Sequence, residues 1–141
     1  MRIMAIDYGD ARTGVAISDP TGLLAGFTTV INAYRPDRVT GQIALLAKEH
    51  RVERLVLGHP INMDGTRGPR SEKAQAMRQL LKETTGLPVV LWDERRTTID
   101  AHQILMSSGK NAKKRKKVVD AVAASLILEG YLTYLKTHPE G

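Results

Sequence analysis

Short apolar runs separated by turn residues open the chain. Residues 3–6 are apolar and end at Asp7, and a polar turn then leads into a second apolar run over 14–19. A third run, rich in Thr and Val, covers 26–31. Runs of about four to eight residues bounded by Gly, Pro and Asp are typical of β-strands, and two runs joined by a short turn predict a hairpin. We therefore expect three strands, with the third paired to the second.

Helical spacing follows these strands. Val39, Ile43, Leu46 and Ala47 recur three or four positions apart or as neighbours, which predicts a helix over 38–50. The next part of the pattern predicts a strand over 55–58, a loop over 62–69, and a helix that Ser71 caps and that ends near Gly86. A strand over 88–92 follows. Two more helices are then predicted: one capped by Thr97 or Thr98 and ending near Met106, and a long one over 118–135. A hairpin followed by alternating helices and strands predicts an α/β fold, in which helices flank a mixed sheet.

Length and composition suit one domain over residues 1–141. The chain has 141 residues, of which 42% are hydrophobic and 26% charged, and these values are ordinary for a globular domain. No apolar run approaches the roughly 20 residues needed to cross a bilayer, and Asp7 interrupts the apolar stretch that a signal peptide would need. We therefore expect a cytoplasmic protein with no membrane partner. The absence of cysteine leaves oxygen or imidazole ligands for any metal ion.

The positive charge is concentrated in one segment. The formal net charge is +6 at pH 7, and residues 110–117 contain six Lys or Arg and no acid. Without that segment the charge is 6 − 6 = 0, so the rest of the chain is balanced. Such a patch predicts contact with a polyanion, and we expect a mobile cationic loop. The alternative is a solvated loop whose charge only aids solubility.

Acidic residues occur where the predicted strands end. Asp7 ends the first strand, Asp93 and Glu94 end the last strand, and Asp120 lies near the start of the final helix. Because strands of an α/β sheet present their carboxyl ends at one edge, we expect these acids to converge. Three of them have a structural alternative: a turn former for Asp7, an ion pair with a following arginine for Glu94, and a helix-dipole contact for Asp120.

Carboxylates placed in this way suit the metal-assisted cleavage of a phosphodiester. That reaction needs an activated water and neutralisation of the charge on the leaving oxygen, and two hard cations about 3.5–4 Å apart supply both. Mg²⁺ and Mn²⁺ prefer carboxylate and phosphate oxygens. Asp7, Glu94 and Asp120 are therefore candidate catalytic residues and candidate ligands of Mg²⁺ or Mn²⁺, with two ions expected.

Four ordered blocks of the sequence resemble the YqgF (RuvX) family. They are IDYGDARTGVAISDP over 6–20, GHPINMDG over 58–65, DERRTT over 93–98 and KKRKKVVDA over 113–121. The family is described as Holliday-junction resolvases and as the nuclease that matures the 5′ end of 16S ribosomal RNA. The resemblance spans essentially the whole chain. It implies an RNase H-like fold with a five-stranded mixed sheet, and an acidic triad at Asp7, Glu94 and Asp120. His59, Arg96 and Thr13 depart from the usual pattern, but none of them replaces a carboxylate.

Basic residues near these blocks are candidate contacts to nucleic acid. Arg12 lies between Gly9 and Gly14, where the backbone can approach a phosphate; it either clamps a phosphate or pairs with Asp10 or Asp19. One Trp, one Phe and four Tyr leave few platforms for stacking bases, which favours recognition of shape and backbone. We predict structured RNA or branched DNA as the partner, bound by a monomer or a homodimer. The candidate contacts are Arg12, Arg67, Arg70, Arg95, Lys113, Lys114, Arg115, Lys116 and Lys117.

The sequence therefore predicts a metal-dependent nuclease. Maturation of the 5′ end of precursor 16S ribosomal RNA is the main interpretation, and resolution of Holliday junctions is the alternative. Residues 7–14 also resemble the phosphate-binding hairpin of sugar kinases and actin-like ATPases, but those proteins clamp ATP between two such domains and this chain has room for one. A non-catalytic factor of ribosome assembly or transcription would keep the fold and the basic segment.

Overall fold

A central five-stranded sheet organises the protein. The computed structural model describes residues 1–9, 11–19, 25–33, 35–59, 68–93 and 112–138, with the side chains of residues 25 and 112–120 left out. The strand order is β3-β2-β1-β4-β5. The strands are β1 (Ile3–Tyr8), β2 (Thr13–Ser18), β3 (Ala25–Ile31), β4 (Arg54–His59) and β5 (Val89–Asp93).

The sheet is mixed, as predicted. β1 pairs with β2 and β2 with β3 in antiparallel fashion, which confirms the hairpin and the third strand. β1 pairs with β4 and β4 with β5 in parallel. As a result β1, β4 and β5 end at the same edge of the sheet, with Tyr8, His59 and Asp93 as their last residues. We call this edge the carboxyl edge.

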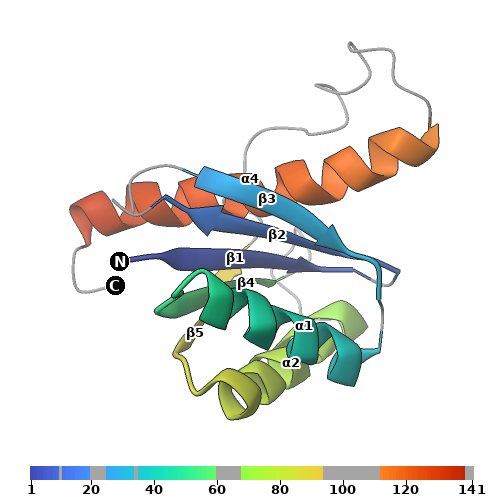
Figure 1. The fold of residues 1–141 in the computed structure, drawn as a ribbon, viewed down its shortest axis with the longest axis horizontal. Coiled ribbons are helices and arrows are strands. Elements are labelled where there is room, and N and C mark those ends of the chain that lie inside the picture. Colours follow the sequence, from blue (N-terminus) through green and yellow to red (C-terminus); the bar gives the residue numbers. More distant parts are fainter. Residues whose placement is uncertain (10, 20–24, 34, 60–67, 94–111, 139–141) are drawn as a thin grey trace.

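Helices cover both faces of the sheet. They are α1 (Pro36–Glu49), α2 (Pro69–Thr85) and α4 (Ala112–Thr137). Figure 1 shows α1 and α2 together on one side of the strands and α4 on the other. The alternation of β1 divides its side chains in the same way, because Met4 and Ile6 join the core under α1 and α2. Ile3 and Ala5 join the core under α4.

α4 is held to the sheet by one stripe of side chains. Ala124, Ile127, Leu128 and Tyr131 are all buried, and their spacing brings them to one side of the helix. Trp92 of β5 lies among them, with its ring centroid 5.8 Å from that of Tyr131 in an edge-on arrangement. An edge-on aromatic pair adds to the stability that the buried area itself gives. This contact fastens the last described strand to the last helix.

The three described helices all begin at the carboxyl edge. α1 follows β3, which ends there, and α2 follows β4. For α4 the direction is fixed by Arg54 at the start of β4, whose Nη1 donates a hydrogen bond of 2.8 Å to the hydroxyl of Tyr131. The later half of α4 therefore lies over the opposite edge, and its first turns lie at the carboxyl edge (Figure 1). Since each helix carries about half a positive charge at its N-terminus, this edge favours anions.

The structure corrects two details of the sequence prediction. The last helix begins at Ala112 instead of residue 118, so Lys113–Lys117 form its first turns and are not a loop. Lys and Arg are good helix formers, and a helix that is docked further along extends easily through them. Ser71 is not a cap, because α2 begins at Pro69 after Gly68. The helix predicted near Thr97 to Met106 lies outside the described residues.

None of the described helices combines the length and the hydropathy that crossing a bilayer requires.

Candidate active site

Asp7 lies at the carboxyl edge, on the face of the sheet that α4 covers. It is the last residue but one of β1 and is half-buried. It follows Ile3 and Ala5 in the alternation, and both of these belong to the core under α4. Its partner on β2 is Gly14. On β4, Leu57 is in register with Ile6, so the residue of β4 that follows beside Asp7 is Gly58. The neighbour of Asp7 on each of the two adjacent strands is therefore a residue without a side chain.

Asp120 belongs to the helix that crosses this face. α4 packs against β1, and Asp120 precedes the buried Ala124 by four residues, which is about one helical turn. It is the ninth residue of α4, so it lies beyond the first turn in which an acid stabilises the helix dipole. The dipole alternative for Asp120 is therefore wrong. The side chain of Asp120 and the whole of Glu94 lie outside what the structure describes.

Asp93 lies on the other face. It is the last residue of β5 and pairs in register with His59. Val89 and Leu91, which precede it at alternate positions, belong to the core under α1 and α2. Asp93 and Asp7 therefore share the carboxyl edge but point to opposite faces of the sheet.

The turn between β1 and β2 requires a glycine and carries Arg12. The Gly9 amide donates a hydrogen bond of 3.0 Å to the carbonyl of Arg12. A Cβ at Gly9 would lie 2.5 Å from that same carbonyl oxygen, so no other residue fits without moving the turn. Arg12 and Asp19 flank β2 at its two ends, roughly 23 Å apart at about 3.3 Å per residue. An ion pair between them is thereby excluded, and the phosphate clamp and a pair with Asp10 remain.

His59 and Ser71 form a buried pair that the sequence analysis missed. Nε2 of His59 lies 2.6 Å from Oγ of Ser71, and Nε2 of Gln75 also donates to that hydroxyl at 3.3 Å. His59 is 6% exposed and Ser71 is fully buried. The pair ties the end of β4 to the first turn of α2. No local pattern indicates it, because the two residues are 12 positions apart and belong to different elements.

We expect Ser71→Ala to lower the free energy of unfolding by about 1–3 kcal/mol. The substitution leaves a ring nitrogen of His59 buried without the hydroxyl that it contacts, and the desolvation of that nitrogen is then uncompensated. Denaturant unfolding followed by circular dichroism measures the change. Thr137→Ala is the matched control, because its hydroxyl also makes a hydrogen bond but is exposed, so a change within about 0.5 kcal/mol is expected. Equal effects of the two substitutions would contradict this role of Ser71.

Basic residues are placed at the carboxyl edge by two helices. Arg70 is the second residue of α2 and is exposed. Lys113–Lys117 occupy the start of α4, whose first turn contains no acid. Cations at a helix N-terminus oppose the dipole, and like charges three or four residues apart repel one another. Charge therefore opposes this arrangement, although Lys and Arg have good intrinsic helix propensity, and contact with a polyanion would offset the repulsion. Arg67 and Arg95 lie outside the described residues.

The larger aromatic side chains of β1, β5 and α4 are mostly committed to packing. Tyr131 is fully buried and Trp92 is 5% exposed. Tyr8, the candidate stacking platform beside Asp7, is half-buried and packs on the core under α1 and α2. Among the described residues close to Asp7, little aromatic surface is therefore available for unpaired bases, in keeping with recognition of shape and backbone.

The oxygen ligands available suit a hard divalent cation. Among the described side chains, no three His, Asp or Glu come together; of the predicted triad, only Asp7 has a described side chain. Asp7 offers a half-buried carboxylate with glycine on each side. A carboxylate donor of this kind fits Mg²⁺ or Mn²⁺, which keep several waters and accept phosphate oxygens. The arrangement of the triad around a metal stays a prediction.

Comparison with known proteins identifies the family. The sequence model of the RuvX family, described as Holliday junction resolvase, matches residues 1–134. A protein of Halothermothrix orenii named "Putative pre-16S rRNA nuclease" is 46% identical over 134 residues, which cover 95% of this chain and 96% of that protein. A protein of the same name from Bacillus subtilis is 44% identical over 137 residues, covering 96% and 99%.

Comparison with solved structures addresses the fold. The structure titled "T. thermophilus RuvC in complex with Holliday junction substrate" matches with a TM-score of 0.63 at 16% identity, covering 95% of this chain and 96% of that one. At this identity the likeness shows the fold alone, and it confirms the RNase H-like α/β architecture with a five-stranded mixed sheet. Together with the family match over nearly the whole chain, these findings show that the chain belongs to the RuvX family.

Proposed function

We propose that this protein is a metal-dependent nuclease that hydrolyses phosphodiester bonds in structured nucleic acid, and that its reaction is the 5′-end maturation of precursor 16S ribosomal RNA. The observation that carries the proposal is the position of Asp7. It is a half-buried carboxylate at the end of the central strand, with glycine on both sides, under the helix that contains Asp120. The names of the relatives from Halothermothrix orenii and Bacillus subtilis support the choice of ribosomal RNA.

In this proposal Asp7, Glu94 and Asp120 hold Mg²⁺ or Mn²⁺, with two ions at the site. Bound there, the ions would lower the pKa of an attacking water and neutralise charge on the leaving oxygen. The three carboxylates set the position of the ions by their own placement on β1, after β5 and on α4. Gly14 and Gly58 keep the space beside Asp7 clear for the phosphate.

The basic residues bind and orient the substrate in the same proposal. Arg12 is carried by a turn that Gly9 keeps tight, immediately after the strand of Asp7. Lys113–Lys117 lie at the start of α4, a few helical turns before the part of the helix that is docked on the sheet. They hold the backbone by charge, so binding falls steeply as the salt concentration rises. Arg67, Arg70 and Arg95 complete the proposed set of contacts.

A four-way DNA junction is the second candidate substrate. It is favoured by the description of the RuvX family as Holliday junction resolvase. Both substrates have phosphodiester backbones that the proposed site could cut. A two-fold symmetric junction would suit a homodimer, whereas an RNA end would suit a monomer.

Cleavage assays with both substrates test the proposal. Labelled precursor 16S ribosomal RNA and a labelled four-way DNA junction are each incubated with the protein and Mg²⁺, Mn²⁺ or EDTA. We expect the RNA to be cut with Mg²⁺ or Mn²⁺, and the rate to fall by about a thousandfold or more in EDTA, since a bound cation contributes several kcal/mol to such a reaction. If the protein cuts the junction in preference to the RNA, branched DNA is its substrate instead. Tight binding without any cutting in either metal would instead indicate a non-catalytic factor.

A further inference from the structure

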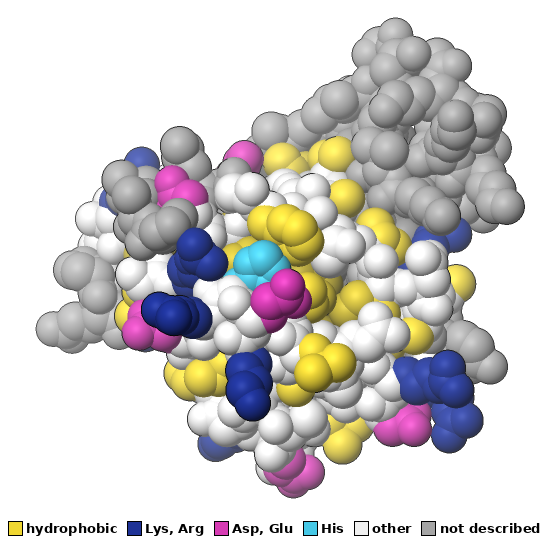
Figure 2. Space-filling model, in the orientation of Figure 1, with side chains coloured by type: hydrophobic (Ala, Val, Ile, Leu, Met, Phe, Trp, Pro, Cys, Tyr) yellow, Lys and Arg dark blue, Asp and Glu magenta, His cyan; other side chains and the backbone are white. Residues whose placement is uncertain are grey.

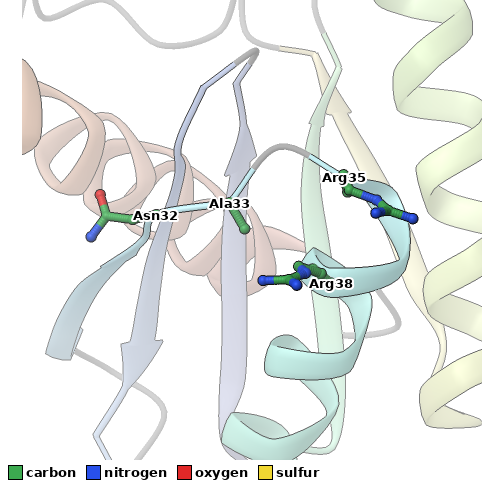
Figure 3. Close-up of a pocket in the computed structure, with 4 residues that line it drawn as sticks. All are labelled: Asn32, Ala33, Arg35 and Arg38. Carbon is green, nitrogen blue, oxygen red and sulfur yellow. The ribbon is translucent and has the colours of Figure 1, made fainter.

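A surface cavity at the start of α1 is lined by arginines that the proposed site does not include. Its volume is about 290 Å³, and it is lined by Asn32, Ala33, Arg35 and Arg38. Figure 2 shows Lys and Arg side chains gathered at the right of the view, over the start of α1. In Figure 3, Asn32 and Ala33 come from the segment after β3, and the Arg38 side chain points from the first turn of α1 toward the sheet beside Ala33. The Arg35 side chain points the other way, and the Asn32 side chain points away from both arginines.

The charge of this cavity is only partly neutralised. Within the described residues, the exposed side chain of Arg38 makes no ion pair or hydrogen bond. Arg35 has one partner, Asp37, at 3.4 Å from Nε to Oδ1, and these side chains are 63% and 68% exposed. An ion pair so open to water contributes little and exchanges readily for another anion. The cavity therefore keeps a net positive charge with guanidinium donors at its wall.

The cavity lies at the carboxyl edge, beside the proposed active site. β3 ends at that edge, because Ile31 pairs with Thr13 and Thr13 with Tyr8. Asp7 of β1 is in register with Gly14 of β2, and Gly14 is in register with Val30 of β3. With about 4.8 Å between strands and about 3.3 Å per residue along them, Asn32 lies roughly 12 Å from Asp7 between Cα atoms. Such a separation corresponds to a few nucleotides along one strand of nucleic acid.

We propose that Arg38 in this cavity, with Arg35 adding positive charge at the cavity wall, binds a backbone phosphate of the substrate a few nucleotides from the bond that is cut. This inference rests on the proposed function and extends its binding surface to α1. Lys113–Lys117 lie at the start of α4, on the opposite face of the sheet. The substrate backbone therefore crosses the carboxyl edge from the α4 side to the α1 side, with Asp7 between the two groups of cations.

The chemistry of the lining favours a phosphate over a base. A guanidinium presents paired N–H donors that match two oxygens of a phosphate. The described lining contains no aromatic ring on which a base could stack.

Salt-dependent binding of charge-matched variants tests the inference. Arg38→Gln and the double variant with Arg35→Gln are compared with wild type and with Lys48→Gln, which removes the same charge from the last turn of α1, at the other end of the helix. Binding of a structured RNA and of a four-way DNA junction is measured in EDTA by fluorescence anisotropy between about 50 and 200 mM salt. We expect the slope of log affinity against log salt to fall by about one for each arginine lost. The affinity itself should fall roughly tenfold for Arg38→Gln.

A stability measurement separates binding from folding. Arg38 lies in the first turn of α1, where a cation opposes the helix dipole, so Arg38→Gln should leave the melting temperature unchanged or raise it slightly. An equal loss of binding in Lys48→Gln, or an unchanged salt slope in both arginine variants, would overturn the inference. A third result would also overturn it: inorganic phosphate stabilises the wild-type protein and not Arg38→Gln, while the two proteins bind nucleic acid equally well. The cavity would then be a site for free anions only.

The proposed function and this inference can be refuted separately. Absence of metal-dependent cutting by the wild-type protein refutes the nuclease, whereas the arginine variants are judged on binding in EDTA alone. A wild-type protein that binds neither RNA nor the junction would refute both.

Discussion

Asp7→Asn is expected to lower the rate of cleavage by about a thousandfold or more while binding of nucleic acid stays within about threefold of wild type. The substitution keeps the size and shape of the side chain at the end of β1 but removes its negative charge. A neutral amide holds a divalent cation much more weakly than a carboxylate does, so the activation of water and the neutralisation of the leaving oxygen are lost together. In the proposed binding mode the substrate is held by the cations of α4 and of the turn at Arg12, which the substitution leaves in place.

Single-turnover cleavage of precursor 16S ribosomal RNA with saturating protein measures this rate, and fluorescence anisotropy measures binding. Asp19→Asn is the matched control, because it makes the same change just after β2, at the opposite edge of the sheet. We expect it to cut at the wild-type rate. Glu94→Gln should lose cleavage as Asp7→Asn does, with little loss of stability. A variant of Asp7 or Glu94 that cuts normally would remove that residue from the triad.

Leu128→Ala is expected to reduce the free energy of unfolding by about 3 kcal/mol, within the 2–5 kcal/mol typical of a buried leucine. Leu128 is fully buried between α4 and the sheet, in a core that includes Ala5 and Val56. Removing its side chain leaves a cavity where α4 is docked. For a chain of this length the change corresponds to a fall of about 10 °C in melting temperature.

Leu45→Ala is the matched control for this prediction. Leu45 is 69% exposed on α1, so the same substitution should change stability by less than about 0.5 kcal/mol. Thermal unfolding at equal protein concentration compares the two variants. A loss in Leu128→Ala no larger than in Leu45→Ala would show that α4 is not held by this stripe of side chains.

The strands were predictable from the sequence because their signals are local. Each strand is a short apolar run with turn residues beside it, and the predicted bounds differ from the structure by one or two residues at most. The pairing of the third strand with the second also follows from short connections. The start of α4 was not predictable in the same way, because a run of Lys and Arg suits both a loop and a helix. Residues further along the helix, such as Leu128, pack on the sheet, and this packing stabilises the helix that the basic residues begin.

The site was predictable in part. The resemblance and the position at a strand end both indicated Asp7, and the structure adds which face it occupies. That information comes from the register with Gly14 and from the burial of its neighbours. The pair of His59 and Ser71 and the cavity beside Arg38 could not be predicted, because each joins residues from separate elements. The roles of Glu94 and Asp120 and the single domain over residues 1–141 stay predictions.

The topology also separates the parts of the proposed site in time during synthesis. Asp7 and Asp120 are 120 − 7 = 113 residues apart in the chain. At about 5–20 residues per second, a ribosome needs on the order of 10 s to travel between them. During that interval the first strand and its glycine neighbours exist without the helix that covers their face. A nascent chain therefore lacks one of the proposed metal ligands until residue 120 has been made, and the proposed site stays incomplete for the whole of that interval.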